Sequence, residues 1–458
     1  MTKHSPVRFR LARKGPDRLS GALIVGLWAA QAGCGAPPAD DASTELSSEE
    51  SALGAALNPY GVSSTVHTSG AIDTTNPFFQ QLGTNPRSCA TCHSSASGWT
   101  TNTLSNSALL LFTQGTAPLF NLVDSGTRPD ADISSFKARL DTFGTTVALK
   151  GLTRFTRKIS PTAEFSLIAV DDPYGWSTTA AYSGFRRPTP TANESKAPSI
   201  TWAGSPTVDV ITQLRGFLHG AATLHEQRDP TNPAPADVAA AAGDFMFGVI
   251  FAQSRDFRAG ALDSDGAKGG PNNLLAQQFY VGINDNAGND PMGHPFNPKV
   301  FDIFDAWAKY ANANGHDVTA SARGAIYRGQ EIFNGAGKCS GCHDSPNVGS
   351  HSVVAFFNTG TAEPPNCSPA LPLLTFQNKT TLETKLSCDL GRAQSTGLWS
   401  DIGRFRAPPL RGLAARAPYF HDGQAQNLRD VINHYDTRFS LALSDSQKRD
   451  LEAFLGAL

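Results

Sequence analysis

The strongest constraint on the fold of this chain is a five-residue pattern, Cys-X-X-Cys-His, that occurs twice. In each copy, two cysteines three positions apart can form thioethers to the two vinyl groups of one haem, and the adjacent histidine is then held beneath the iron as its proximal ligand. The chain is therefore predicted to bind two covalent haem c groups, through Cys89, Cys92 and His93 and through Cys339, Cys342 and His343.

A zinc site or a thiol redox pair would also use a Cys-X-X-Cys pair. Zinc needs two further Cys or His ligands at matching spacing, and none follows either copy. With 7 cysteines and 11 histidines among 458 residues, two accidental copies of the full pattern are improbable. We therefore favour haem over zinc or thiol redox chemistry.

The N-terminus has the features of an export signal, which covalent haem attachment requires. A basic stretch precedes an apolar run, residues 19–30, that is too short to span a bilayer as a mature helix. The run ends at Gln31-Ala32-Gly33-Cys34, which resembles a bacterial lipoprotein cleavage box, although an aliphatic residue is usual in place of Gln31. We predict a signal peptide over residues 1–34 and a mature protein in the periplasm or at the outer membrane. It is either anchored through a lipid on Cys34, its only membrane contact, or cut nearby and soluble.

Composition and motif spacing suggest the domain organisation. A stretch rich in Pro, Ala, Ser and acidic residues follows the signal and is typical of a disordered tether, which we place at residues 35–60. An N-terminal haem domain with insertions is expected over 61–318 and a C-terminal cytochrome c domain over 319–458. The expected fold class is mainly α, with two cytochrome c-like haem domains, the first carrying long irregular insertions. The 38 basic and 40 acidic side chains nearly balance, so nucleic acid is not expected as a partner.

Local patterns predict several elements. Apolar spacing favours a helix from about Thr319 to Phe333, and Ser444 with Gln447 forms a capping box that starts the last helix. Further helices are expected over 237–254 and after Asn297, the latter containing Phe301, Phe304 and Trp307. After the haem thiols and Cys34 are assigned, two cysteines remain, and in an oxidising compartment they are expected to form a disulfide, Cys367 to Cys388.

The sixth ligand of each iron decides between electron transfer and reaction with oxygen or peroxide. The only methionines are Met1, Met246 and Met292, and none follows the second haem motif. The C-terminal haem therefore lacks a local His/Met pair. Its own domain offers other ligands, namely His351, His421, His434, Tyr419 and Tyr435.

Two stretches, 406–412 (RAPPLRG) and 417–423 (APYFHDG), resemble the C-terminal signature of bacterial di-haem cytochrome c peroxidases and their relatives. The resemblance implies that the sixth ligand of the C-terminal haem follows the His-Asp-Gly turn. The position that carries methionine in the peroxidases falls on Tyr435, which is similar to the His/Tyr ligation of the methylamine-dehydrogenase maturase. His434 would give bis-His ligation, as in rubber oxygenases. Met246, Met292 or no protein ligand are the remaining alternatives.

The resemblance also implies that the N-terminal haem is the reactive one. Family members place a tryptophan between the haems in a Trp-Asp-Gly-Arg element, and the nearest match here is Trp202-Ala203-Gly204-Ser205, without the Asp and Arg. The residues around the first motif look more like the rubber-oxygenase branch, in which a distal phenylalanine faces dioxygen. Phe217 falls near that place, with His219 and His225 as alternative distal residues. Ordinary packing is the competing interpretation for Trp202 and Phe217.

The expected function is that of a di-haem c-type cytochrome oxidoreductase of the cytochrome c peroxidase family. It would activate peroxide or dioxygen at the N-terminal haem, with electron transfer through the C-terminal haem and a redox protein or the small oxidant as partner. The alternative is a non-catalytic electron-transfer cytochrome c with both irons saturated. Family members commonly hold a calcium ion between the modules, and here it would use main-chain carbonyls near Arg416 and Pro418.

Overall fold

The computed structural model of the chain describes residues 54–204 and 209–458. The predicted signal peptide, Cys34 and the tether up to residue 53 lie outside the described residues. Within the described residues, every helix is too short or too polar to span a bilayer. The disordered tether was expected to extend to residue 60, but Ala55–Asn58 forms a strand that pairs with Gly61–His67 and buries Ala56.

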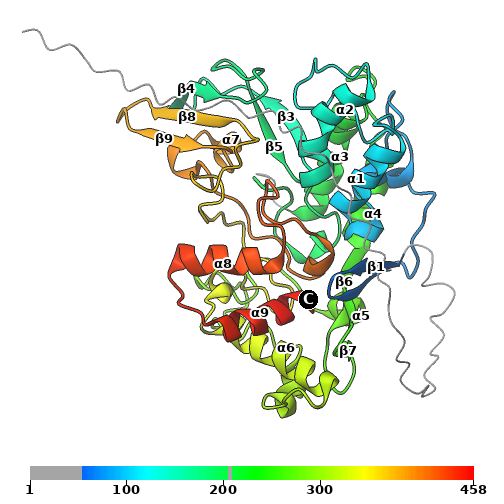
Figure 1. Cartoon of the computed structure of the whole chain (residues 1–458), viewed down its shortest axis with the longest axis vertical. Helices are drawn as coiled ribbons and strands as arrows, with labels where there is room; N and C mark the ends of the chain where they lie inside the picture. The colour runs from blue at the N-terminus through cyan, green and yellow to red at the C-terminus, as the bar shows by residue number, and fades with distance from the viewer. Residues whose placement is uncertain (1–53, 205–208) are drawn as a thin grey trace, which may run out of the picture. The chain divides into compact units, whose positions relative to one another are not determined.

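The helices of the described chain are distributed along its whole length (Figure 1). They are α1 (Thr103–Phe112), α2 (Phe136–Phe143), α3 (Val210–His225), α4 (Ala236–Gly248), α5 (Gly270–Ala276), α6 (Val318–Asn334), α7 (Ala393–Thr396), α8 (Leu428–Phe439) and α9 (Asp445–Gly456).

The strands form three small sheets. They are β1 (Ala55–Asn58), β2 (Gly61–His67), β3 (Thr153–Arg157), β4 (Phe165–Asp171), β5 (Tyr182–Arg186), β6 (Val249–Asp256), β7 (Gly260–Ala261), β8 (Leu373–Asn378) and β9 (Thr384–Ser387). The sheet orders are β1-β2-β6-β7, β3-β5 and β4-β8-β9, and the pairs within them are antiparallel. Helix accounts for 33% of the structure and strand for 14%, so the expectation of a mainly α fold is not confirmed.

The predicted first and last helices of the C-terminal haem domain are confirmed. Helix α6 packs against α9, and α8 lies beside them (Figure 1). Gly329 permits the close crossing, because a Cβ there would lie 2.0 Å from the carbonyl oxygen of Asp450. Helix α9 begins with the predicted capping box, in which the Ser444 hydroxyl accepts from the Gln447 backbone N–H and the Gln447 side chain accepts in return.

The core around these helices also includes earlier residues. Phe301, Phe304 and Trp307 are buried with Phe333 of α6 and Phe454 of α9. Instead of the longer helix expected after Asn297, a 3-10 helix forms over Asp305–Tyr310, which contains Trp307 but neither Phe301 nor Phe304. Residues from 259 to 307 thus pack with the C-terminal haem domain, whose proposed boundary at residue 319 stays a prediction.

The predicted helix over 237–254 is correct only in its first part. Helix α4 ends at Gly248, and the chain continues as β6, which pairs with β2. The β-branched and aromatic run Val249-Ile250-Phe251 suits a buried strand, and these residues have no exposed surface. Pairing with β2 explains why the helical pattern does not continue.

The predicted disulfide between Cys367 and Cys388 is present. It lies in a small apolar cluster with Ala362, Phe405 and Trp202.

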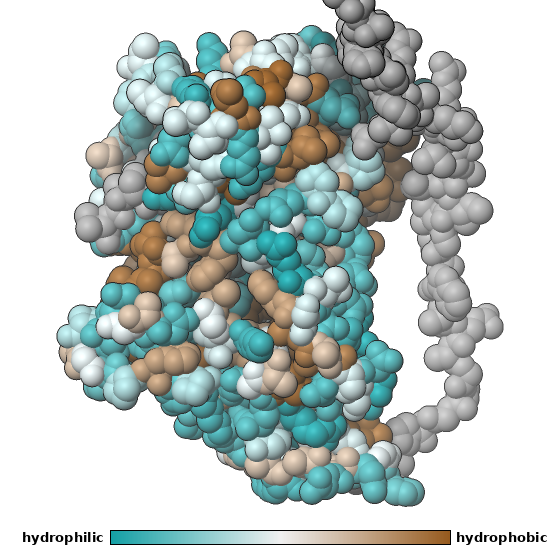
Figure 2. Space-filling view, turned by 90° about the vertical axis from the view of Figure 1, so that its left-hand side faces the viewer, coloured by the Kyte–Doolittle hydropathy of each residue, from teal (hydrophilic) through white to brown (hydrophobic). Residues whose placement is uncertain are grey.

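Strands β4 and β8 pair although more than two hundred residues separate them in the sequence, so the two predicted haem domains share one sheet. Apolar residues also interrupt the hydrophilic surface across the middle of the face shown in Figure 2.

Candidate haem-binding sites

The two Cys-X-X-Cys-His motifs adopt the same local conformation. Each forms one 3-10 turn, Cys89–Thr91 and Cys339–Gly341, and in each the histidine backbone N–H donates to the first cysteine carbonyl at 3.0 Å. Attachment to a single haem requires both thiols and the imidazole to lie on one side of such a turn.

Each motif histidine has a backbone partner six residues further along the chain. The Nδ1 of His93 lies 3.1 Å from the carbonyl oxygen of Trp99, and the Nδ1 of His343 is hydrogen-bonded to the carbonyl of Gly349. Donation from Nδ1 to a carbonyl fixes the tautomer and leaves Nε2 free to bind iron. Burial lowers the pKa of both imidazoles to about 4, so they are neutral at physiological pH.

A large apolar cavity opens beside the C-terminal motif. Cys339, Cys342 and His343 all contribute to its wall. The rest of the lining is mostly aromatic and aliphatic, and includes Trp202, Phe333, Phe357, Phe405, Tyr419, Phe420, Val431, Ile432, Tyr435, Phe439, Leu451 and Leu455. An apolar slot with two thiols and an imidazole on one wall fits a haem macrocycle.

The cavity also has cationic groups that fit the two propionates of a haem. Arg187, Arg406 and Arg416 line it, and all three are buried. The Nε and Nη2 of Arg416 are buried without a hydrogen-bond partner, which is costly unless a ligand supplies an acceptor. Burial lowers the pKa of both Arg187 and Arg416 to about 10. The residues present therefore fit haem c at this site.

The two candidate sixth ligands of the C-terminal haem have different surroundings. Tyr435 lines the cavity and lies close enough to Cys339 and Cys342 for their thiols to influence its pKa, which burial raises. The ring of His434 is turned to another partner, with its Nε2 2.9 Å from the carbonyl oxygen of Thr359. The same helix, α8, thus presents Tyr435 to the cavity and holds His434 elsewhere.

Two predicted residues lie beside the same cavity in other roles. Trp202 lines it, donates from Nε1 to the carbonyl of Arg187 at 2.7 Å, and meets Phe405 edge to face. His421 also lines the cavity and stacks on Phe405 with ring centroids 4.3 Å apart. Trp202 therefore adjoins the site predicted for the C-terminal haem.

The N-terminal motif is connected to this cavity through the chain itself. Trp99 holds His93 through its carbonyl, and the next residue, Thr100, lines the cavity. The guanidinium of Arg187 donates to the carbonyl of Thr101 and also lines the cavity. A route of one hydrogen bond and one peptide unit therefore runs from His93 to the wall of the other site.

Polar groups gather near the N-terminal motif. The thiol of Cys89 lies 3.8 Å from Oε1 of Glu226, a buried carboxylate whose other oxygen accepts from the Leu82 backbone N–H at 2.6 Å. The neighbouring His225 is hydrogen-bonded through Nδ1 to Asp124, which also pairs with Arg87. Desolvation raises the pKa of Glu226.

The predicted distal residues on α3 are placed unequally. Phe217 is 46% exposed and His219 is also exposed, whereas His225 is held by Asp124. The distal role of Phe217 stays a prediction. The carbonyl of Arg416, expected near calcium, accepts from Arg187 Nη2 at 3.3 Å, and calcium binding also stays a prediction.

Sequence reasoning missed the residues that orient the two histidines. Trp99 and Gly349 act through backbone carbonyls, which no side-chain pattern reveals, although both follow their histidine by six positions. Arg187 was also missed. Its signal is the Arg187-Pro188 sequence directly after β5, which ends at Arg186, but the sequence does not show that the side chain is buried.

Comparison with known proteins adds independent evidence, although no family model matches the chain. A cytochrome-c peroxidase of Denitromonas iodatirespirans, IdrP2, is 34% identical over 143 residues, which is 28% of this chain and 38% of the relative. The cytochrome c551 peroxidase of Pseudomonas aeruginosa is 33% identical over 132 residues, 29% of this chain and 33% of the relative. The methylamine utilization protein MauG of Methylorubrum extorquens is 29% identical over 168 residues, 34% of this chain and 38% of the relative.

These matches span well under half the length of the curated relatives. Among solved structures, a MauG-like protein associated with microbial copper homeostasis covers 62% of this chain and 75% of its own, at 20% identity and a TM-score of 0.36, too low to support a structural argument. The sequence relatives, which are peroxidases and MauG, agree with the interpretation of the paired motifs as haem-attachment sites. These findings support the superfamily of di-haem cytochrome c peroxidases and MauG and imply covalently bound haem c as the cofactor.

Proposed function

We propose that this chain is an exported di-haem oxidoreductase in which the N-terminal haem activates peroxide or dioxygen and the C-terminal haem stores or relays electrons. The observation that carries the proposal is the direct connection between the two sites. The carbonyl of Trp99 holds His93, and Thr100, the next residue, lines the cavity beside His343. Two redox centres linked by such a route can exchange electrons.

The roles of the protein groups follow from their positions. Haem iron with an open or weakly held face can react with peroxide or dioxygen, whereas iron with two strong ligands transfers electrons. His93 and His343 are held by carbonyls through Nδ1, so Nε2 of each would be free to bind iron. Trp202, which adjoins the C-terminal cavity, is the side chain best placed there to assist transfer between the sites.

We assign Tyr435 as the sixth ligand of the C-terminal haem. It lines the cavity that contains His343, whereas His434 is engaged with the carbonyl of Thr359. A phenolate stabilises ferric iron and lowers the potential relative to a methionine thioether. Tyr435→Phe should change the ferric absorption spectrum, while the matched control His434→Gln should leave it unchanged. The reverse pattern would assign His434 instead.

At the N-terminal haem, His225 and Glu226 are the candidate proton-handling groups. Glu226 lies beside the thiol of Cys89, and His225 is oriented by Asp124. A histidine oriented by a carboxylate is a suitable general acid or base. We therefore expect these two residues to move protons at the N-terminal haem.

Peroxide addition to the ferric holoprotein tests the proposed activity. Stopped-flow absorption spectra should show a rapid change in the Soret region, at a rate that depends on peroxide concentration, or the ferrous protein should consume dioxygen. Two six-coordinate, low-spin haems that react with neither oxidant would refute the enzymatic proposal.

A non-catalytic electron carrier is the second candidate function. It is favoured by the missing Asp and Arg around Trp202. The peroxide experiment separates the two functions, because a carrier with saturated irons exchanges electrons with a redox protein and ignores peroxide.

A further inference from the structure

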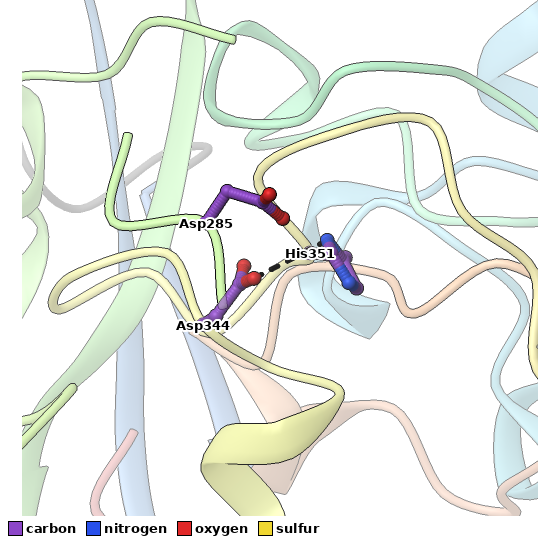
Figure 3. A group of neighbouring side chains, drawn as sticks. All are labelled: Asp285, Asp344 and His351. Atoms are coloured by element: carbon purple, nitrogen blue, oxygen red, sulfur yellow. Dashed lines mark ion pairs between the residues drawn. The ribbon is translucent and has the colours of Figure 1, made fainter. Parts of the chain in front are cut away.

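A buried group of three side chains lies outside the haem cavity, next to the C-terminal motif. Asp285, Asp344 and His351 each present a potential metal-ligand atom, and these atoms lie within 4.8 Å of one another. The residues are only 1%, 0% and 5% exposed. Figure 3 shows both carboxylates directed toward the imidazole of His351 from separate segments of the chain.

Each carboxylate is anchored by protein hydrogen bonds. Oδ2 of Asp285 accepts from the backbone and side chain of Asn289 at 2.9 and 2.6 Å. Oδ1 of Asp344 accepts from the backbone N–H of Ser352 at 2.7 Å, and its Oδ2 from that of Asn286 at 3.3 Å. These bonds fix the orientation of both groups before any ligand arrives.

Among the atoms that face one another, Oδ1 of Asp285 lacks a donor. Oδ1 of Asp285 is buried and has no hydrogen-bond partner. Nδ1 of His351 lies 3.4 Å from Oδ2 of Asp344, but it accepts from the backbone N–H of Val353 at 3.3 Å, so the ring proton belongs on Nε2. A carboxylate of each aspartate and an unprotonated nitrogen thus face one another.

Such an arrangement requires a positive charge. Among the described residues, Asp344 pairs only with His351, at 3.4 Å, and neither carboxylate pairs with a Lys or Arg. Burying carboxylates without compensation is strongly unfavourable. A divalent cation would neutralise both carboxylates and would take the lone pair of His351 Nδ1 in place of the long 3.3 Å contact from the Val353 backbone N–H.

We propose that Asp285, Asp344 and His351 bind one divalent first-row transition-metal ion, with zinc as the simplest occupant. Metal–ligand bonds of about 2.0–2.2 Å place two ligands up to roughly 4 Å apart, so only small adjustments are needed here. One imidazole with two carboxylates suits zinc or its first-row neighbours. Calcium and magnesium prefer oxygen ligands alone, so the histidine argues against them.

The position of the site gives the ion a role in the haem domain. Asp344 directly follows His343, and the loop between Asp344 and His351 contains Gly349, whose carbonyl holds the His343 imidazole. An ion bound to both ends of this loop would fix that carbonyl, and Asp285 would tie the loop to the preceding segment. The three ligands are thus positioning residues for the proximal histidine.

Zinc binding to the full-length holoprotein tests the proposal directly. After treatment with a chelator, calorimetric titration with Zn²⁺ and elemental analysis should show one tightly bound ion per chain. Asp285→Asn should weaken binding by at least about 100-fold. The matched control is Asp290→Asn, because Asp290 lies in the same segment and its carboxylate is already bound by Tyr280, Met292 and Asn284. This control should bind Zn²⁺ as the wild type does.

Absence of a tight Zn²⁺ site in the wild-type holoprotein would overturn the proposal, and this result does not depend on any variant folding. Equal binding by Asp285→Asn and the wild type would also overturn it, since the ion would then lie elsewhere. Removal of the ion should shift the reduction potential of the C-terminal haem. An unchanged potential would refute the positioning role.

Discussion

The buried ion pair between Glu194 and Arg406 yields a quantitative prediction. The two side chains form two hydrogen bonds of 3.0 and 3.2 Å, and the residues are only 3% and 7% exposed. Arg406 also lines the haem cavity, so the pair joins Glu194–Lys196 to the wall of that site. Removal of one partner of a buried pair leaves the other charge uncompensated and costs about 3–5 kcal/mol.

Glu194→Gln should therefore lower the free energy of unfolding by about 3 kcal/mol, the lower end of that range, because the glutamine oxygen can still accept one hydrogen bond from Arg406. Arg215 and Asp244 provide the matched control. Their side chains are 48% and 51% exposed, so Asp244→Asn should cost less than about 1 kcal/mol.

Urea unfolding of the holoproteins, followed by circular dichroism and by Soret absorption, measures both losses. Burial raises the pKa of Glu194, while Arg406 acts to lower it. The desolvation of the carboxylate therefore makes a large unfavourable contribution to the free energy of the pair. Glu194→Gln combined with Arg406→Met should therefore recover most of the stability. Similar small losses in Glu194→Gln and Asp244→Asn would refute this reasoning.

Three further predictions follow from other contacts. Replacing both Cys367 and Cys388 with serine should cost about 3 kcal/mol of unfolding free energy, since the bridge closes a loop of 21 residues; equal urea midpoints would contradict this. Burial opposes ionisation of Asp389, but the Arg186 guanidinium at 2.6 Å lowers its pKa overall. The ionised Asp389 therefore stabilises the folded protein fully above the usual carboxyl pKa of about 4, and this contribution is lost as pH falls through the depressed value. Between about pH 6 and 3, the free energy of unfolding should consequently fall less in Asp389→Asn than in the wild type. Arg416→Gln should lower the reduction potential of the C-terminal haem by removing a buried positive charge, and a redox titration with no shift would contradict this.

The local elements of the C-terminal haem domain could be predicted because their signals are local. The capping box at Ser444 and the apolar spacing before Phe333 specify α9 and α6 within a few residues. The thiol and imidazole positions follow from the motif itself, and the disulfide follows from the cysteines left over.

Other features depend on contacts that the sequence does not reveal. Strand β6 replaces the end of a predicted helix because β2, nearly two hundred residues earlier, pairs with it. The choice between Tyr435 and His434 depends on which one α8 turns toward the cavity, and adjacent helical positions point about 100° apart. The partners of His93 and His343 are backbone carbonyls, which carry no residue signature.

The central claim is that the two haems are inequivalent and that only the N-terminal one reacts with oxidant. The electron paramagnetic resonance spectrum of the ferric holoprotein, recorded before and after one equivalent of peroxide, tests this claim most directly. We expect two separate ferric signals, with the signal of the His93 haem altered by peroxide and that of the haem bound by His343 and Tyr435 still low-spin and six-coordinate. Two identical low-spin signals that do not change on addition of peroxide would contradict it.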